Sequence, residues 1–480
     1  MDMQQKQLHF VLLPFMAQGH MIPTVDIARL LGKRGLIVTI LVTQKNYSRF
    51  KTCRSWSPEG CENFDMLYSI DDISKFFIAT SMLEEQVETI LQKLEPYPSC
   101  LISDMCYPWT TNVAVRLGIP RLVFHGISCF SMLCMHMLIA SKCFEDIIAS
   151  DTEYFVVPGL PGRIEITKAQ IRGTSDQLPP ALAKIRVQMI DADVEAFGTV
   201  ANTFEELEPE YVKQYMKVKG KKVWCIGPVS LCNEDESDKA ERGDKASIDE
   251  HECLKWLDLQ KSKSVIYACL GSVSSLAASQ LVELGLGLEA SDRPFIWVVR
   301  NASDEFKKWL DEERFEERVR KRGLLIHGWA PQVLILSHPS VGGFLTHCGW
   351  NSTLEGITAG LPMVTWPVFA EQFCNEKFVV NVIKTGIRVG VEVPVMAGEE
   401  ENVGVQVKSD EIKTVIGKLM DGGEEGEERI ERARKLREMA KSAPGEGGSS
   451  YLSLTQLVRD VVATKARFGC QSGNGEKLES

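Results

Sequence analysis

Apolar and amphipathic segments alternate from the start of the chain. Residues 8–15, "LHFVLLPF", form a continuous apolar run, which is typical of a strand buried in a parallel sheet. Residues 22–35 repeat apolar side chains at helical spacing and stop at Gly35. Residues 36–43 are again rich in β-branched side chains, so the order strand, helix, strand predicts a βαβ unit. The same alternation predicts further elements over 100–104, 110–118 and 121–126.

A charged segment in the middle of the chain interrupts this pattern. Residues 233–251 hold eight acidic and three basic side chains and almost no apolar ones, which is the composition of a linker. The alternation restarts after it, and apolar runs predict strands over 264–272, 294–300, 323–329, 341–347 and 362–368. We therefore expect an α/β protein with two doubly wound parallel sheets, in domains 1–232 and 252–450. A helix over 451–468 is expected to pack back toward the first domain, and 469–480 to be a disordered tail.

Length and charge limit the possible functions. A chain of 480 residues exceeds one ordinary core, and its formal charge of −11 argues against nucleic-acid or anionic-membrane surfaces. The polar start carries no secretory signal, and no apolar run is long enough to span a membrane. Fourteen cysteines are scattered without metal-ligand spacing, which indicates reduced thiols. A cytoplasmic protein without membrane insertion is the expectation.

The densest chemistry lies in "HCGWNSTLEG", residues 347–356, between a predicted strand and a predicted helix. Asn351 or Ser352 is expected to cap this helix, whose first N–H groups would face an anion. Glycines before the turn suit a diphosphate, and His347 can add a donor. The pattern Ser352-x-x-Glu355 is also an ordinary capping box, so the residues alone leave the ligand open.

The 44 positions from Trp329 to Gln372 match a longer residue pattern than an anion site alone requires. The stretch "WAPQVLILSHPSVGGFLTHCGWNSTLEGITAGLPMVTWPVFAEQ" resembles the donor-binding signature of plant family 1 UDP-dependent glycosyltransferases. "FMAQGHMIP", "VANTFEELEP" and "IGPVSL" are similar to the same family elsewhere in the chain. The resemblance implies the GT-B architecture, in which two Rossmann-like domains face each other and the second binds the donor.

The resemblance also implies a role for each residue of the donor site. Trp329 would stack on uracil, Gln332 would bond ribose or base, and Glu355 would accept from the ribose hydroxyls. His347, Asn351 and Ser352 would bind the phosphates, with a contact from Ser272. Trp350, Glu371 and Gln372 would hold the sugar, although many relatives have Asp at the Glu371 position. The implied UDP-sugar-binding set is Ser272, Trp329, Ala330, Gln332, His347, Trp350, Asn351, Ser352, Glu355, Glu371 and Gln372.

His20 and Asp104 are the candidate catalytic pair. Both follow predicted strands, so they are expected at the same edge of one sheet. A carboxylate that orients a histidine is a general-base arrangement, but either residue alone is more often structural. The family has catalytic His and Asp at these positions, so the resemblance implies an inverting transfer of glucose from UDP-glucose. In the family, Gln at the position of Gln372 is associated with glucose, and His at this position with galactose. UDP-glucuronate and UDP-galactose stay open as donors. A UDP-sugar epimerase, a hydrolase and a non-catalytic UDP-sugar binder stay open as functions.

The acceptor is the least determined part of the site. The family places a lipophilic hydroxylated acceptor here, with a triterpenoid or steroidal aglycone favoured and a flavonoid or hormone possible. Residues expected near it are Met16, Gly19, Trp109, Phe124 and His125, with Met132, Met135 and Met137 as a possible apolar wall. Asp191-Ala-Asp193 spells a metal-binding D-x-D, but on a helix the two side chains diverge, so we interpret them as solvated surface. No metal, no cofactor and a monomer are expected.

Overall fold

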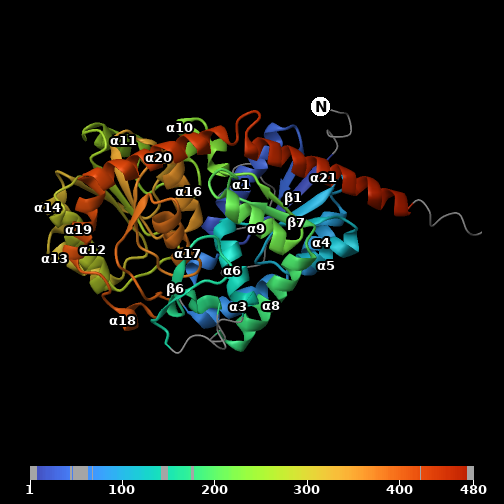
Figure 1. The fold of residues 1–480 in the computed structure, drawn as a ribbon, viewed down its shortest axis with the longest axis horizontal. Coiled ribbons are helices and arrows are strands. Elements are labelled where there is room, and N and C mark those ends of the chain that lie inside the picture. Colours follow the sequence, from blue (N-terminus) through green and yellow to red (C-terminus); the bar gives the residue numbers. More distant parts are fainter. Residues whose placement is uncertain are drawn as a thin grey trace, which may run out of the picture.

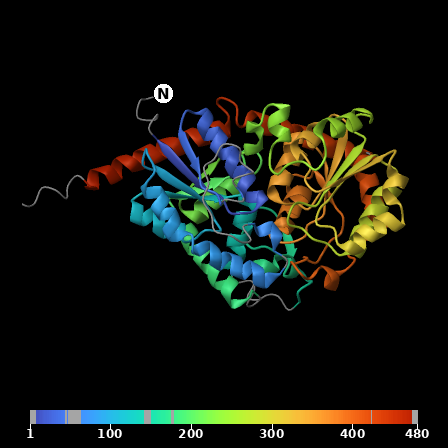
Figure 2. The same ribbon diagram turned by 180° about the vertical axis from the view of Figure 1, so that it is seen from behind.

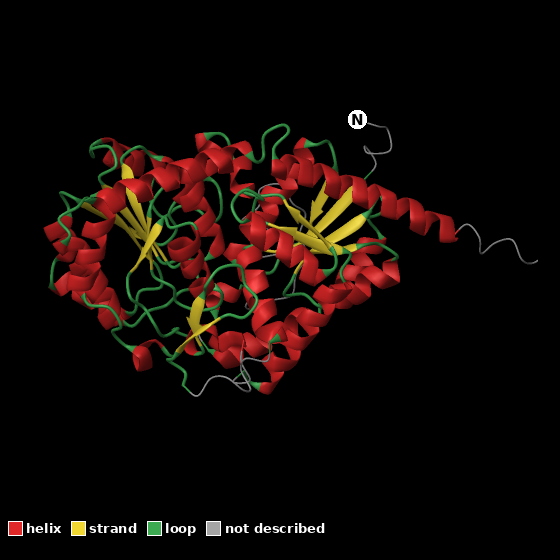
Figure 3. Ribbon diagram, in the orientation of Figure 1, coloured by secondary structure: helices red, strands yellow, loops and turns green. Residues whose placement is uncertain are grey.

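Two α/β domains lie side by side in the computed structural model of the chain (Figure 1), which describes residues 8–43, 46, 63–67, 69–141, 150–174, 178–421 and 423–472. Each domain contains one six-stranded sheet with all strands parallel and helices on both faces (Figure 3). The predicted architecture of two facing Rossmann-like sheets is confirmed.

The first sheet has the strand order β2-β1-β3-β4-β7-β8. Its strands are β1 (His9–Leu13), β2 (Ile37–Ile40), β3 (Cys100–Asp104), β4 (Arg121–His125), β7 (Gly198–Ala201) and β8 (Lys222–Cys225). Every residue of β1 is buried, because β2 and β3 flank it and helices cover both faces. The surrounding helices are α1 (Gln18–Lys33), α3 (Ile70–Ser81), α4 (Glu84–Gln92), α5 (Thr110–Leu117), α6 (Cys129–Ala140), α8 (Pro180–Glu195) and α9 (Pro209–Lys219), and β5 (Tyr154–Val156) and β6 (Glu165–Thr167) form a separate hairpin.

The second sheet has the order β11-β10-β9-β12-β13-β14. Its strands are β9 (Val265–Cys269), β10 (Phe295–Val299), β11 (Gly323–His327), β12 (Val341–Thr346), β13 (Met363–Thr365) and β14 (Gly386–Arg388). The helices are α11 (Glu250–Asp258), α12 (Ala278–Ala290), α13 (Asp304–Glu312), α14 (Phe315–Val319), α15 (Gln332–Ser337), α16 (Trp350–Ala359), α17 (Gln372–Lys377), α18 (Glu400–Val403), α19 (Ser409–Met420) and α20 (Glu424–Ser442). The strand order reverses direction beside β9, so the carboxyl ends of β9 and β12 are the expected ligand position.

The last helix, α21 (Ser449–Ser472), crosses from the second domain to the first (Figures 1 and 2). While α20 packs on α16, α21 packs on β8. The apolar face of α21 is buried in the same cluster as Phe10 of β1 and Trp224 of β8; it consists of Leu454, Leu457, Val458 and Val461. The helix continues into the stretch expected to be a disordered tail, and residues 473–480 lie outside the described part of the chain.

The predicted linker is more structured than its composition indicates. It contains a short helix, α10 (Glu236–Ala240), and the start of α11. Among the described residues, no helix combines the length and the apolar character that crossing a bilayer requires.

Candidate active site

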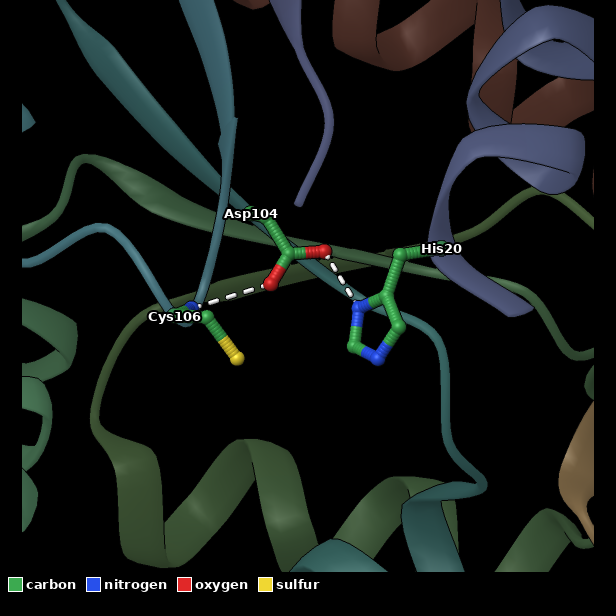
Figure 4. Close-up of side chains that lie close together, drawn as sticks. All are labelled: His20, Asp104 and Cys106. Atoms are coloured by element: carbon green, nitrogen blue, oxygen red, sulfur yellow. Dashed lines mark hydrogen bonds and ion pairs between the residues drawn. The ribbon is translucent and has the colours of Figure 1, made fainter. Parts of the chain in front are cut away.

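His20 and Asp104 meet at the carboxyl edge of the first sheet. His20 lies in the first turn of α1, directly after β1, and Asp104 is the last residue of the adjacent strand β3. His20 Nδ1 lies 2.7 Å from one carboxylate oxygen of Asp104, and the other oxygen accepts the backbone N–H of Cys106 at 2.9 Å (Figure 4). The second ring nitrogen of His20 points away from Asp104 (Figure 4). The arrangement fixes the imidazole and leaves Nε2 for another group.

The electrostatics of this pair stabilise a charged imidazole. Burial disfavours the charged form of His20, but the charge of Asp104 and the hydrogen bond to it outweigh burial, so the pKa of His20 is raised above 6.5. Burial likewise opposes ionisation of Asp104, and the contact with His20 still holds its pKa below the ordinary value. The side chain of Asp104 is completely buried while that of His20 is 31% exposed. His20 can therefore accept a proton from a ligand at its exposed side, and Asp104 stabilises the charged ring.

The turn after β12 differs from the predicted capping box. Helix α16 begins at Trp350 with Gly349 as its N-cap, and no side chain caps it. Asn351 and Ser352 thus lie inside the first turn, and the predicted cap at either residue is wrong. Because the cap is a glycine, the first N–H groups of α16 are not taken up by a side chain and stay available to an anion.

His347 is held between two glycines at the ends of β9 and β12. A Cβ on Gly271 would lie 2.5 Å from His347 Nε2, and one on Gly349 would lie 2.3 Å from it. Gly271 also has a φ of +85°, which L side chains rarely adopt. Burial lowers the pKa of His347 to about 4, so the ring is neutral at pH 7 and donates through only one nitrogen. The sequence analysis did not single out Gly271, whose role depends on a tertiary neighbour.

Glu355 connects the other predicted donor residues. Its Oε2 accepts from Gln332 Nε2 at 2.8 Å, and the same nitrogen lies 3.0 Å from Ser352 Oγ. The guanidinium of Arg300 lies 4.9 Å from the centre of the Trp329 ring. Trp329, Gln332, Ser352 and Glu355 therefore surround one space, as a nucleoside site requires.

The linker contributes a residue that the sequence analysis missed. Arg242 bonds Glu355 through one guanidinium nitrogen and Asp26 of α1 through the others, at 2.9 Å, and is only 8% exposed. The next residue, Gly243, lies against Trp329, where a Cβ would come within 2.2 Å of the indole. The acidic linker thus places an arginine beside the predicted donor residues.

The two domains meet next to His20. Asn351 Nδ2 donates to the backbone oxygen of Gly19, and Trp350 Nε1 donates to the backbone oxygen of Asn202 at 2.7 Å. The first turn of α16 is therefore hydrogen-bonded to the residue preceding His20. The Trp350 indole N–H is used in this contact, which leaves the main chain of Trp350 for a ligand.

A cavity of about 670 Å³ lies between the domains at this point. Most residues of the predicted site line it: Gly19, His20, His125, Ser272, Trp329, Ala330, Gln332, His347, Trp350, Asn351, Ser352, Glu355 and Glu371. Glu371 is half-buried here, and desolvation raises the pKa of its carboxyl group. The structure thus gathers the predicted donor residues and His20 around one space.

Asp104 and Met137 do not line this cavity, and neither do four further predicted residues, Gln372, Phe124, Met16 and Trp109. Gln372 accepts the backbone N–H groups of Val368 and Phe369 through its Oε1, at 2.8 and 3.1 Å. Phe124 points into the core beneath α21, because consecutive side chains of a strand face opposite sides and His125 takes the cavity side.

The other two, Met16 and Trp109, pack in the cluster around Phe15 and Tyr107. Met16 lines a different cavity, beside β2. The structure thus places Met16, Trp109 and Phe124 outside this cavity, and their part in acceptor binding stays a prediction.

The interpretation of Asp191 and Asp193 as solvated surface is half correct. The segment is helical and the two side chains diverge, with Asp191 exposed. Asp193 instead lines the cavity and binds two side chains, His125 Nε2 at 2.9 Å and Lys219 Nζ. The partners come from β4 and α9, which helical spacing alone could not indicate.

One group of side chains within the described residues has ligand atoms close enough for a metal ion. His20, Asp104 and Cys106 offer ligand atoms within 4.8 Å of one another (Figure 4). Burial and the charge of Asp104 raise the pKa of the Cys106 thiol well above 9, so this group stays protonated at neutral pH. A protonated thiol is a poor metal ligand, and the three residues fit a proton-transfer site better.

Comparison with known proteins identifies the family. A family model described as UDP-glucoronosyl and UDP-glucosyl transferase matches residues 242–408. UDP-glycosyltransferase 73E1 of Stevia rebaudiana is 52% identical over 480 residues, which cover 95% of this chain and 97% of that protein. The chain belongs to the plant family 1 UDP-glycosyltransferases. UDP-glycosyltransferase 73C5 of Arabidopsis thaliana is 50% identical, with 95% and 97% covered.

Solved structures of other UDP-glycosyltransferases share the fold of this one. UGT73P12 of Glycyrrhiza uralensis, complexed with glycyrrhetinic acid 3-O-monoglucuronide, has a TM-score of 0.89 and 36% identity, with 97% of this chain and 98% of that chain covered. UGT2 of Phytolacca americana, complexed with UDP-2fluoro-glucose and pterostilbene, has a TM-score of 0.74 and 28% identity, with 95% and 99% covered. The GT-B architecture and a glycosyltransferase activity follow for this UDP-glycosyltransferase.

Proposed function

We propose that this UDP-glycosyltransferase moves glucose from UDP-glucose to a hydroxyl group of a lipophilic small molecule, with inversion at the anomeric carbon. The observation that carries this proposal is the position of His20. Its Nδ1 is bound to Asp104, its side chain lines the cavity of the donor residues, and its neighbour Gly19 is bonded to Asn351 of the donor helix.

His20 Nε2 takes the proton of the acceptor hydroxyl while the hydroxyl oxygen bonds to the anomeric carbon. The bond from this carbon to the diphosphate oxygen breaks on the opposite face, and UDP leaves with the electron pair. Attack opposite the leaving group converts the α-glycosidic donor into a β-glycoside. Asp104 acts as a positioning residue, because it orients the ring and stabilises the imidazolium that forms.

Negative charge grows on the departing diphosphate, next to the uncapped N-terminus of α16. The N–H groups of this turn and the neutral His347 are fixed donors there, and Arg242 lies on the same cavity. Uracil would stack on Trp329 and the ribose would bond Glu355. Gly243 would then move away from the Trp329 ring or share it with uracil, and Arg242 would release Glu355 or share it with the ribose.

A triterpenoid or steroidal acceptor is the favoured class. The first domain lines the cavity with apolar side chains from α6 and α8, among them Met132, Met135, Met189 and Ile190. UGT73P12, similar over nearly the whole chain, is complexed with glycyrrhetinic acid 3-O-monoglucuronide. A flavonoid or a plant hormone would be the next classes to test.

An acceptor panel tests the proposal directly. The purified protein is incubated with UDP-glucose, UDP-galactose or UDP-glucuronate and with triterpenoid, steroid and flavonoid alcohols, and products are identified by mass. We expect a mass gain of one hexose with UDP-glucose, and a proton NMR coupling typical of a β-linkage. A new sugar nucleotide, or free sugar formed at the same rate without acceptor, would instead indicate an epimerase or a hydrolase.

Replacing His20 separates catalysis from binding. His20→Ala is expected to lower the transfer rate by at least about 10²-fold, the usual contribution of a general base. UDP affinity, measured by calorimetry, should stay near the wild-type value, since His20 is not among the nucleotide ligands. Unchanged turnover in this variant would contradict the role of His20.

The reaction is proposed to need no metal ion. Transfer should therefore persist in EDTA and gain nothing from added Mg²⁺ or Mn²⁺. Loss of activity in EDTA that Mg²⁺ restores would contradict this part of the proposal.

A further inference from the structure

The acceptor side of the cavity contains a polar group that the transfer reaction does not use. His125 at the end of β4, Asp193 in the last turn of α8 and Lys219 at the end of α9 all line the cavity. Around them the walls are apolar, with Met132, Met189 and Ile190 among the lining residues. A buried polar group in an apolar wall usually fixes the orientation of a ligand.

The three side chains form one connected unit centred on Asp193. One carboxylate oxygen accepts from His125 Nε2 at 2.9 Å, and the other accepts from Lys219 Nζ. The side chains of His125 and Lys219 are 6% and 7% exposed, whereas that of Asp193 is 21% exposed. Asp193 is therefore the member of the unit that a ligand can reach most easily.

Asp193 is ionised in this setting. Burial works against its charge, but His125 and Lys219 hold its pKa well below the ordinary range. An ionised carboxylate can accept about four hydrogen bonds, and the contacts above use one on each oxygen. Asp193 can accept a further hydrogen bond from a ligand.

The charge balance of the unit indicates which ligand group fits. Lys219 offsets the charge of Asp193, so an uncharged hydroxyl adds no net charge when it donates to Asp193. A ligand carboxylate would add a second negative charge beside the first, which is unfavourable in a buried site. The unit is suited to a neutral hydrogen-bond donor.

The position of the unit relates it to the reacting hydroxyl. Strand β4 pairs with β3, where Phe124 lies opposite Asp104, so His125 and the His20–Asp104 pair lie at neighbouring strand ends. A Cβ on Gly126 would lie 3.9 Å from the oxygen of Gly19. One acceptor molecule can therefore contact His20 with one group and Asp193 with another.

We propose that His125, Asp193 and Lys219 form an acceptor subsite that binds a second hydroxyl group, so that this enzyme prefers acceptors with two hydroxyls on one apolar body. Asp193 accepts the hydrogen bond, and His125 and Lys219 position its carboxylate. The inference rests on the proposed function, because it assumes an acceptor alcohol bound beside His20.

The test compares diols with matched mono-alcohols. The probes are 5α-androstane-3β,17β-diol with its two mono-alcohols, and 7,4′-dihydroxyflavone with 7-hydroxyflavone, each with UDP-glucose. For the wild-type enzyme we expect kcat/KM about tenfold or more higher for a diol than for its mono-alcohol, the usual effect of losing the partner of a buried polar group. The difference should lie mainly in KM.

Two aspartates on one helix provide a matched pair of variants. Asp193→Asn should bring the ratio of kcat/KM between diol and mono-alcohol close to one, while Asp191→Asn, at the exposed position, should keep the wild-type ratio. Lys219→Met is the second variant if Asp193→Asn fails to fold, and it should also reduce the ratio. Thermal unfolding and UDP affinity serve as checks of folding.

The outcomes separate the two proposals. Equal kcat/KM for diol and mono-alcohol in both wild-type pairs overturns the subsite even without variants, and so does an unchanged ratio in Asp193→Asn. If the wild-type enzyme transfers glucose to none of the probes or panel acceptors, the proposed function fails instead.

Discussion

At the level of single residues, the proposed role of His20 as the base predicts that the pH dependence of transfer follows from its contact with Asp104. His20 must be deprotonated to act as a base, and its raised pKa means that kcat/KM should fall to half its maximum above pH 6.5 on the acid side. Asp104→Asn removes the charge that raises this pKa, so the acid limb should move to lower pH while the maximal rate falls. The measurement is the pH profile of kcat/KM for both proteins.

The amide would also satisfy fewer contacts than the carboxylate. One carboxylate oxygen of Asp104 accepts from His20 and the other from Cys106. In Asn one of these two oxygens is replaced by an NH₂ group, so only one of the two hydrogen bonds can still form. A profile of Asp104→Asn with the wild-type midpoint would show that Asp104 has no electrostatic effect on the base.

Gly271 should be as important for donor binding as the polar residues near it. Gly271→Ala combines a left-handed backbone with a Cβ 2.5 Å from His347 Nε2, so the ring has to move. UDP affinity should fall about tenfold or more, as expected for losing a hydrogen bond to a charged group. Gly118→Ala is the control, because Gly118 has a φ of +63° with no atom within 4 Å of an added Cβ.

The two glycine variants are compared by calorimetry with UDP and by urea unfolding. Both should lose about 1–2 kcal/mol of stability from the left-handed conformation, but only Gly271→Ala should lose affinity. Wild-type affinity in Gly271→Ala would mean that His347 does not contact the donor.

At the level of secondary structure, the linker stabilises the interface through Arg242. Its guanidinium is shared by Asp26 of α1 and Glu355 of α16, all nearly fully buried. Arg242→Met leaves two buried carboxylates without a cation, which should cost about 3–5 kcal/mol in the free energy of unfolding. Arg434→Met removes an arginine that bonds Glu431 and Glu438 on the exposed face of α20, and it should leave stability unchanged.

Urea unfolding of both arginine variants is the measurement. Equal stability of Arg242→Met and the wild type would show that the linker is only loosely held. Added UDP should recover part of the loss in Arg242→Met, because ribose hydroxyls are proposed to bind Glu355.

Strands that lie inside long apolar runs could be predicted from the sequence, while strands outside such runs could not. The predicted strands over 8–15 and 341–347 correspond to β1 and β12, whose residues are buried almost throughout. Strands β7, β8 and β14, "GTVA", "KVWC" and "GIR", lie in shorter apolar stretches and were not predicted. Strands β2 and β13 are equally short, but they lie inside the longer predicted runs 36–43 and 362–368.

Side-chain direction and tertiary neighbours explain the other differences at the site. Phe124 and His125 are consecutive in a strand, so only one of them could face the acceptor. Arg242 lies in a segment with linker composition, and nothing in that composition indicates its buried partners. The contacts of Asp193 could not be predicted either, because His125 and Lys219 come from β4 and α9 and reach it only in the folded structure. By contrast, most of the predicted donor residues come from the continuous stretch Trp329–Gln372, so the sequence alone could group them.

At the level of the whole molecule, the carboxyl-terminal helices connect the two domains on the side away from the hairpin of β5 and β6. Helix α20 packs on α16, which begins at the donor site, and α21 packs on β8 of the first sheet. Trp224 Nε1 of β8 also donates to Asp460 of α21 at 3.2 Å. Because these helices follow each other, loss of α21 packing should weaken the alignment of both halves of the site.

Leu457→Ala tests this coupling, with Leu452→Ala as its control on the same helix. Leu457 is 1% exposed in the core of the first domain, so the truncation should lower the free energy of unfolding by about 2–5 kcal/mol. Leu452 is 54% exposed, and its truncation should change stability by less than about 0.5 kcal/mol. Unfolding is followed by circular dichroism and tryptophan fluorescence, with and without UDP. If α21 couples the domains, the wild type unfolds in one transition whose midpoint UDP raises, and Leu457→Ala lowers the stability of the whole chain. Two transitions already in the wild type, of which UDP shifts only that of the second domain, would show that α21 does not couple the domains.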